Sequence, residues 1–428
     1  MDHRQPITPK LLSFLPSSFL VKKELVYALF FLLVLISSFV FFNFVSPLQP
    51  QTIFDVAFFT QLFTIDKSSI TSNTCDYSSG RWVSDVNRPL KSYTENCPLL
   101  DPGFRCRRNG RTDDGYLKWR WQPNGCDLPR FDARDLLERS RNGRIVFAGD
   151  SIGRNQWESM LCMLSQGVSN LSTIYEVNGS PITKHKGYLS IRFSEYNLTV
   201  EYYRVPFLVI TGPPPKNSSS KIRSAIRVDK LHWRSLTWVG ADVLVFNAGH
   251  WWSQDKTTKM GYYFQEGGTI NNTMDAIEAL RRSLQTWKSW AMQSLDADKS
   301  HIFFRSYSPI HYRQVKLNGT WNDGGGCDKD VKPETNDENP DAEPVHNHFI
   351  SETVKQMRSE NRKAQFLNIT YLTDFRRDGH PSLYREPSTP VNAPQDCSHW
   401  CLPGIPDTWN ELLYAQLVSD GFRISSHN

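Results

Sequence analysis

The sequence lacks a strong excess of charge of either sign. Its 428 residues carry 49 Lys and Arg against 44 Asp and Glu, a formal net charge of +5 at pH 7. So mild a balance gives no indication of nucleic-acid binding, and we expect no nucleic-acid partner; at most it tolerates acidic partners. The chain also lacks an internal repeat. With 39% hydrophobic and 22% charged residues it is typical of a globular protein rather than a disordered one.

Metal-ligating residues at suitable spacing are missing as well. Cys397 and Cys401 resemble half of a zinc site, but no second close Cys/His pair completes it. His346 and His348 are interpreted as a surface pair. The acidic run 328–343 matches no calcium-binding loop, so we interpret it as a solvated loop. We therefore expect no metal ion and no tightly bound cofactor.

One uncharged segment, residues 25–45, is long enough to cross a bilayer as a helix. Basic residues outnumber acidic ones in residues 1–24, so the positive-inside rule puts that tail in the cytosol and the rest of the chain in the lumen. We predict a single-pass, type II signal anchor followed by a stem over 46–74. A cleaved signal peptide is the alternative, although its apolar core usually spans only about 7–15 residues.

All eight cysteines follow this segment, an even number in a compartment expected to be oxidising, which favours disulfides. Spacing alone leaves their pairing open. Asn-x-Ser/Thr sequences on the same side agree with passage through the secretory pathway. These glycosylation candidates are Asn170, Asn178, Asn197, Asn217, Asn271, Asn318 and Asn368.

The remaining chain divides by composition into two parts. Residues 75–131 are rich in Cys, Trp and turn residues and are expected to form a subdomain held by cystines and by packing on a neighbour. In residues 132–428 short apolar strands alternate with helical patterns, which indicates an open α/β sandwich with a mostly parallel sheet. The strands are expected at 145–148, 200–209, 243–246, 302–304 and 366–372. The helices are expected at 274–292, 351–363 and 408–418, the last with Asp407 as its N-cap.

The stretch 145–155 runs from an apolar strand through Gly-Asp-Ser into a helix-like segment that starts near Gly153. Such a turn suits a serine nucleophile, because a helix N-terminus stabilises an oxyanion that forms beside Ser151. An ordinary helix-capping turn is the alternative reading. A serine nucleophile needs a base and an acid, and His399 and Asp396 supply both near the end of the chain.

Gly149-x-Ser151-x-Gly153 also matches the nucleophile elbow of α/β-hydrolases. In that fold, however, the acid and the histidine come from separate loops, whereas here Asp396 and His399 are only three residues apart. A Gly-Asp-Ser motif followed far downstream by Asp-x-x-His resembles the SGNH/GDSL hydrolase superfamily instead. There one short segment presents both partners of the serine, with the aspartate fixing the imidazole tautomer.

Further motifs resemble the plant trichome birefringence-like family from Cys75 onward. They include Cys75-Asp76 with Gly80-x-Trp82, Trp119-Arg120-Trp121-x-Pro123, Asn247-x-Gly249-His250-Trp251-Trp252, and Asp396-Cys397-Ser398-His399-Trp400-Cys401-Leu402-Pro403-Gly404. The resemblance implies an SGNH/GDSL-like three-layer sandwich with a Cys-rich N-terminal subdomain. It also implies a Golgi type II membrane protein that O-acetylates wall polysaccharides, with xylan favoured and pectin next. Such an enzyme requires an acetyl donor and a polysaccharide acceptor.

The resemblance assigns Ser151 as nucleophile, His399 as general acid/base and Asp396 as its orienting carboxylate. By analogy with the superfamily, Asn247 or Gly249 completes the oxyanion hole. Aromatic faces and hydroxyl-binding side chains make further residues candidates for sugar binding, although core packing is the alternative for the tryptophans. These candidates are Arg154, Asn155, His250, Trp251, Trp252 and Trp400.

The resemblance also implies a disulfide pairing: Cys75 with Cys126, Cys97 with Cys162, Cys106 with Cys401, and Cys327 with Cys397. The last two would clamp the Asp396–His399 segment from both sides. Two other functions stay open. An acetyl esterase of the same fold would use the same triad, and a non-catalytic protein that binds pectin or other wall polysaccharides would not need Ser151.

Overall fold

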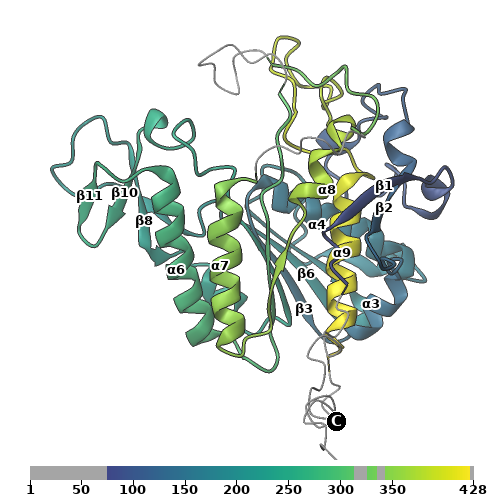
Figure 1. The fold of residues 1–428 in the computed structure, drawn as a ribbon, viewed down its shortest axis with the longest axis horizontal. Helices are drawn as coiled ribbons and strands as arrows, with labels where there is room; N and C mark the ends of the chain where they lie inside the picture. Colours follow the sequence, from purple (N-terminus) through teal and green to yellow (C-terminus); the bar gives the residue numbers. More distant parts are fainter. Residues whose placement is uncertain (1–74, 313–324, 335–342, 425–428) are drawn as a thin grey trace, which may run out of the picture. The chain divides into compact units, whose positions relative to one another are not determined.

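The computed structural model describes residues 75–312, 325–334 and 343–424 (Figure 1). The predicted cytosolic tail, anchor and stem lie outside these residues. Within the described ranges, none of the helices combines the length and the apolar character that crossing a membrane requires.

A seven-stranded sheet forms the centre of the fold, in the order β13-β12-β9-β3-β6-β5-β4. The strands from β13 to β6 run parallel, and β5 and β4 add antiparallel pairs at one edge. Their bounds are β3 Arg144–Gly149, β4 Ile174–Glu176, β5 Tyr188–Phe193, β6 Leu198–Arg204, β9 Val243–Asn247, β12 His301–Arg305 and β13 Ala364–Leu367. The mostly parallel sheet expected from the sequence is confirmed.

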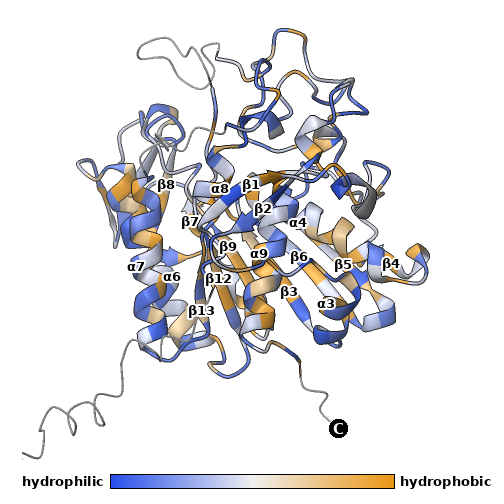
Figure 2. Ribbon diagram, turned by 45° about the vertical axis from the view of Figure 1, so that its right-hand side comes forward, coloured by the Kyte–Doolittle hydropathy of each residue, from blue (hydrophilic) through white to orange (hydrophobic). Residues whose placement is uncertain are grey.

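Helices cover both faces of this sheet because its central strands are apolar on both sides (Figure 2). In β3, Ile145 and Phe147 pack into one core cluster, while Val146 and Ala148 pack into the other. The first face is covered by α3 (Ala133–Arg139), α4 (Ser151–Leu164) and α9 (Ile405–Ser419), and the second by α6 (Ala276–Ser294) and α7 (Val345–Ser359). The result is the three-layer α/β sandwich that was predicted.

A second sheet, in the order β11-β10-β8-β7, packs against α6. Its strands are β7 Val209–Gly212, β8 Ser224–Leu231, β10 Tyr262–Glu266 and β11 Thr269–Asn271. The expected strand over 200–209 is therefore two strands in different sheets. The chain turns between them, where Leu208 has φ of 59° and its N–H bonds to the carbonyl of Val205.

The Cys-rich N-terminal region contains an antiparallel pair of strands, β1 (Gly80–Ser84) and β2 (Trp119–Pro123). The Cys75–Cys126 disulfide lies within this region, whereas Cys97–Cys162 ties it to α4. The indole of Trp82 donates to the carbonyl of Leu372 at 2.7 Å. Cystines and neighbour packing therefore hold this region on the sandwich.

Three elements in the last part of the chain have bounds that differ from the prediction. The expected strand 366–372 is β13 followed by the short helix α8 (Thr370–Asp374), because the Ser306 hydroxyl accepts the N–H groups of Ile369 and Thr370 and caps that helix. Helix α9 begins at Ile405, so Asp407 is not its N-cap but accepts the N–H of Gly404 from inside the first turn, at 3.0 Å. Helix α7 also begins and ends earlier than expected.

Trp287 on α6 is a central residue of the hydrophobic core. It is fully buried and meets Phe304 and Phe246 edge-on, with ring centroids 4.9 and 5.2 Å apart. We expect Trp287→Ala to lower the free energy of unfolding by about 3–5 kcal/mol, because it removes a large buried side chain and leaves a cavity. Trp233, with 59% of its surface exposed, is the matched control. Its change to alanine is expected to cost about 0.5 kcal/mol or less in denaturant unfolding. Equal losses in the two variants would contradict this core assignment.

Candidate active site

Ser151 is the first residue of α4, directly after the strand β3 and Asp150. Asp150 is the N-cap, and its Oδ1 accepts the N–H groups of Ile152 at 2.9 Å and Gly153 at 3.4 Å. This cap starts the helix at Ser151 rather than near Gly153. The partly exposed serine therefore lies at the positive end of a 14-residue helix, where negative charge is stabilised.

Asn247, the last residue of β9, packs against the turn that carries Ser151. A Cβ atom at Gly149 or Gly153 would lie 2.0 or 1.9 Å from Asn247 Oδ1, so only glycine fits at either position. Asn247 Nδ2 donates to Asp150 Oδ1 at 2.5 Å. Asn247 thus fixes the shape of the turn, and its expected contact with an oxyanion stays a prediction. Gly249, at φ of +146°, has a conformation that favours glycine and abuts the ring of Tyr307.

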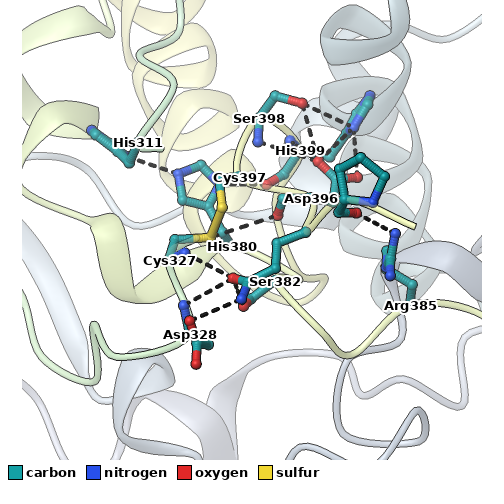
Figure 3. Close-up of a disulfide and its surroundings, with 12 residues drawn as sticks. His311, Cys327, Asp328, His380, Ser382, Arg385, Asp396, Cys397, Ser398 and His399 are labelled. Atoms are coloured by element: carbon teal, nitrogen blue, oxygen red, sulfur yellow. Dashed lines mark hydrogen bonds and ion pairs between the residues drawn. A yellow bond between two sulfur atoms is a disulfide. The ribbon is translucent and has the colours of Figure 1, made fainter. Parts of the chain in front are cut away.

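Asp396 holds His399 through both the ring and the backbone (Figure 3). Its Oδ2 and Oδ1 lie 2.9 and 3.1 Å from Nδ1, and Oδ1 also accepts the backbone N–H of His399 at 3.0 Å. Because the carboxylate occupies Nδ1, Nε2 is the ring nitrogen left to accept a proton. The two side chains are 23% and 27% exposed, so both can be reached from solvent.

Two hydrogen bonds tie this segment to the helix of Ser151. Asn155 Nδ2 donates to the carbonyl of Trp400 at 3.1 Å, and Asn155 Oδ1 accepts the N–H of Trp400 at 2.7 Å. Asn155 lies one helical turn after Ser151, on the same face of α4. Trp400 directly follows His399. These two hydrogen bonds, which we call the Asn155 clamp, therefore bring together, at one end of α4, two parts of the chain that are 245 residues apart in sequence.

Disulfides hold the 396–401 segment on both sides. Cys327–Cys397 lies beside Asp396 (Figure 3), and Cys106–Cys401 closes the other side. Beside the first disulfide, the backbone of Asp396 pairs with Ser382 through N–H···O bonds of 2.9 and 3.1 Å. Together with Cys75–Cys126 and Cys97–Cys162, these are the four pairs that the family resemblance implied.

Burial opposes the charged forms of His399 and Asp396, but attraction and hydrogen bonding together outweigh it in the titration of the pair. Burial would raise the pKa of Asp396, but attraction to His399 and hydrogen bonds from His399 and Ser398 hold that pKa well below its usual range. Burial would lower the pKa of His399, but attraction and hydrogen bonding to Asp396 outweigh it and raise that pKa. Asp396 therefore stays ionised and His399 takes up a proton readily.

Most of the residues expected to contact sugar are buried, which leaves them little surface for a direct contact. Arg154 is 2% exposed and pairs with Glu158 at 2.7 Å, while Asn155 is consumed by the clamp. Trp252 is 1% exposed and meets Phe207 edge-on, and Trp400 is fully buried. For these two tryptophans core packing, the alternative reading, is the one that the structure shows.

His250 and Trp251 are partly exposed and remain candidates for substrate contact. His250 stacks on Tyr307 with ring centroids 4.4 Å apart, and burial lowers its pKa to about 4, so the imidazole stays neutral at physiological pH. The Nζ of Lys256 lies 5.6 Å from the ring centroid of Trp251.

Sequence reasoning missed three buried polar residues around the site: Arg305, His311 and His380. Arg305, at the end of β12, donates Nη1 to the carbonyl of Ile152 at 3.1 Å and so supports the first turn of α4. Burial lowers its pKa to about 10, so it remains a cation at neutral pH. Its position at the carboxyl end of a parallel strand was the available signal. His311 and His380 lie in loops with no local signature.

The remaining candidate positions differ in accessibility. Four asparagines of the glycosylation sequences, Asn170, Asn178, Asn197 and Asn217, are exposed, and two, Asn271 and Asn368, are half-buried. Asn318 lies outside the described residues. In the part of the chain that the structure describes, no three His, Cys, Asp or Glu side chains form a group that could hold a metal ion.

Comparison with known families agrees with this geometry. Residues 128–416 match the PC-Esterase model, described as a GDSL/SGNH-like acyl-esterase family found in Pmr5 and Cas1p. Residues 73–127 match the PMR5 N-terminal domain. The class defined by fold and site is therefore that of SGNH-like acyl-transfer or hydrolytic enzymes.

Similarity to individual proteins shows to which family within this class of enzymes the chain belongs. The chain is 54% identical over 428 residues to protein trichome birefringence-like 9 of Arabidopsis thaliana, covering 99% of this chain and 100% of the relative. It is 43% identical over 347 residues to trichome birefringence-like 6 of the same plant, covering 80% of this chain and 70% of the relative. The chain belongs to the trichome birefringence-like family.

The raised pKa of His399 generates a prediction for pH dependence. Its imidazole accepts the Ser151 proton only when deprotonated, so the reaction rate of Ser151 should rise with pH through a value above about 6.5, the pKa of free histidine. Asp396→Asn removes the attraction that raises this pKa. We expect the acid limb of kcat/KM for an activated acetyl ester to move to lower pH, with a lower plateau. An acid limb that stays in place would contradict the coupling.

The packing of Asn247 on Gly153 generates a second prediction. Gly153→Ala places a Cβ against the amide, and we expect a loss of about 2 kcal/mol or more in the free energy of unfolding. In an Asn247→Ala background the same change should cost less, because the blocking atom is gone. Gly268, with open space around it, is the control, and its change to alanine is expected to be nearly neutral. Equal costs in both backgrounds would show that Asn247 is not the obstacle.

Proposed function

We propose that the chain is a Golgi-anchored, type II O-acetyltransferase that transfers acetyl groups to hydroxyls of plant wall polysaccharides, with xylan the favoured acceptor and pectin next. The observation that carries the chemistry is the Asn155 clamp, which joins the His399–Asp396 pair to the helix that begins with Ser151. The polysaccharide, the acetyl donor and the Golgi anchor are inferred from the family resemblance and from the uncharged segment 25–45.

The first half-reaction loads an acetyl group on the enzyme. Ser151 Oγ attacks the acetyl carbonyl of the donor while His399 Nε2 takes the hydroxyl proton, and Asp396 stabilises the imidazolium that forms. The oxyanion develops at the α4 N-terminus, where the helix dipole stabilises it. The tetrahedral intermediate collapses, the bond to the donor breaks, and His399 returns the proton to the leaving group. Acetyl-Ser151 results.

The second half-reaction transfers that group to the sugar. A sugar hydroxyl attacks the acetyl-Ser151 carbonyl, and His399 Nε2 accepts its proton. Collapse of the intermediate breaks the bond to Ser151 Oγ, which regains a proton from His399. The acetylated glycan leaves and the enzyme is regenerated. Water in place of the sugar would give free acetate, so positioning of the acceptor decides between transfer and hydrolysis.

The test is transfer by the full chain from acetyl coenzyme A or p-nitrophenyl acetate to a panel of deacetylated xylan, pectin and mannan, read by mass spectrometry of the products. We expect acetylated glycan, with xylan the best acceptor. Ser151→Ala should lower the transfer rate by about a thousandfold or more, because the nucleophile acts as a unit with His399. Ser289→Ala, at an exposed position of α6, should leave the rate unchanged.

An acetyl esterase is the second candidate, and the description of the matched family model as acyl-esterase favours it. The same experiment separates the two functions. Free acetate that depends on Ser151, without acetylated glycan from any acceptor, would replace the transferase with the esterase. Transfer that survives Ser151→Ala would contradict both.

A further inference from the structure

Behind the catalytic segment lies a buried chain of hydrogen bonds that ends on the backbone of His399 (Figure 3). His380 Nδ1 lies 2.6 Å from the carbonyl oxygen of His399, and His380 Nε2 lies 2.7 Å from His311 Nδ1. His311 Nε2 in turn lies 3.3 Å from Asp374 Oδ1, at the end of α8. His311 and His380 are 5% and 2% exposed, so water has little access to the bond between the two rings, whereas the Asp374 side chain is 12% exposed.

The carbonyl at one end fixes the direction of the first bond, and the neutral state of the buried His380 ring fixes the second. A carbonyl oxygen only accepts, so His380 Nδ1 carries a hydrogen. Burial and the neighbouring His311 hold the pKa of His380 well below its usual value, so this ring is neutral and its Nε2 accepts. His311 Nδ1 must then donate. In His380, Nδ1 is therefore the donor and Nε2 the acceptor, and in His311 Nδ1 is the donor.

The last link requires one additional proton. With Nδ1 of His311 protonated, its Nε2 meets a carboxylate oxygen, and two acceptors cannot bond to each other. The proton between them is carried either by His311 as an imidazolium or by Asp374 as a carboxylic acid. In both forms the Asp374–His311 pair has no net charge, which suits a buried site.

The chain completes the restraint on the polar backbone groups of His399 and Trp400. The N–H of His399 is held by Asp396, both polar backbone groups of Trp400 are held by Asn155, and the carbonyl of His399 is held by His380. His380 also stacks on Trp400, with ring centroids 3.9 Å apart. The backbone N–H of His311 donates to the carbonyl of Cys397 at 3.0 Å. No other hydrogen bond to the carbonyl of His399 is found among the described residues.

We propose that Asp374, His311 and His380 are positioning residues that orient the peptide of His399 through a directional hydrogen-bond chain, so that Nε2 is held in place to accept the Ser151 proton. This inference rests on the proposed roles of His399 and Ser151, but not on the identity of donor or acceptor. It predicts that a side chain able to donate at the Nδ1 position of His380 preserves function and that an apolar one does not.

The experiment measures the rate at which a fluorophosphonate labels Ser151 in the full chain, because this reaction needs the His399 base but no polysaccharide. His380→Leu removes the donor, and we expect the labelling rate to fall by about tenfold or more. His380→Asn keeps an N–H near the Nδ1 position and should recover most of that loss. His348→Leu, at an exposed position of α7, is the histidine control.

A second pair of variants tests the proton count. Asp374→Asn offers an N–H to a neutral His311 Nε2 and preserves the chain without the extra proton, whereas Asp374→Leu breaks it. We therefore expect the asparagine variant to label several-fold faster than the leucine variant, at matched melting temperature. If Asp374 acted only as a charge partner, both variants would slow labelling equally, and that result would overturn the inference.

The outcome is separable from that of the proposed function. If the labelling rates change as expected in these variants but the protein transfers no acetyl group, the hydrogen-bond chain is supported and the transferase is rejected. If the wild-type protein transfers acetyl groups but the labelling rates of His380→Leu, His380→Asn and wild type are equal, the transferase is supported and the role of the hydrogen-bond chain is rejected. A melting temperature measured for each variant keeps loss of folding from being read as loss of positioning.

Discussion

The pair of hydrogen bonds between Asn155 and the backbone of Trp400 is the constraint on which the site depends. It fixes a loop near the end of the chain to the first turns of α4, although Asn155 and Trp400 are 245 residues apart in sequence. Because both polar backbone groups of one residue are satisfied by one buried amide, the loop has a single register on the helix. Disulfides at Cys397 and Cys401 then limit its motion on either side.

The site combines rigid support with partial exposure. Its serine, its histidine and Asp396 are partly open to solvent, whereas four residues that support them, Asp150, Asn155, Asn247 and Arg305, are at most 3% exposed. Each support satisfies a specific polar group of the turn or the loop, so the reacting atoms are held by buried bonds that water does not exchange. This division explains why several side chains that suit sugar binding by type serve instead as internal supports.

Sequence patterns predicted the parts of the structure that are encoded locally. The apolar strand, the Gly-Asp-Ser turn and the amphipathic helix α6 all follow from neighbouring residues. The pairing of cysteines came from family resemblance, since spacing leaves it open. His380 was missed because its partners, His311 and the carbonyl of His399, are distant in sequence. The start of α8 was missed for a similar reason, because its cap is the distant Ser306.

The central claim is that Ser151 carries the acetyl group between donor and acceptor. The most direct measurement is mass spectrometry of the full chain, quenched in acid after incubation with p-nitrophenyl acetate in the absence of any glycan and then digested. The account predicts a single acetylated peptide that contains Ser151, and its loss when a competent acceptor is added before the quench. An acetyl group on another residue, or a Ser151 peptide that stays unmodified while the ester is consumed, would contradict it.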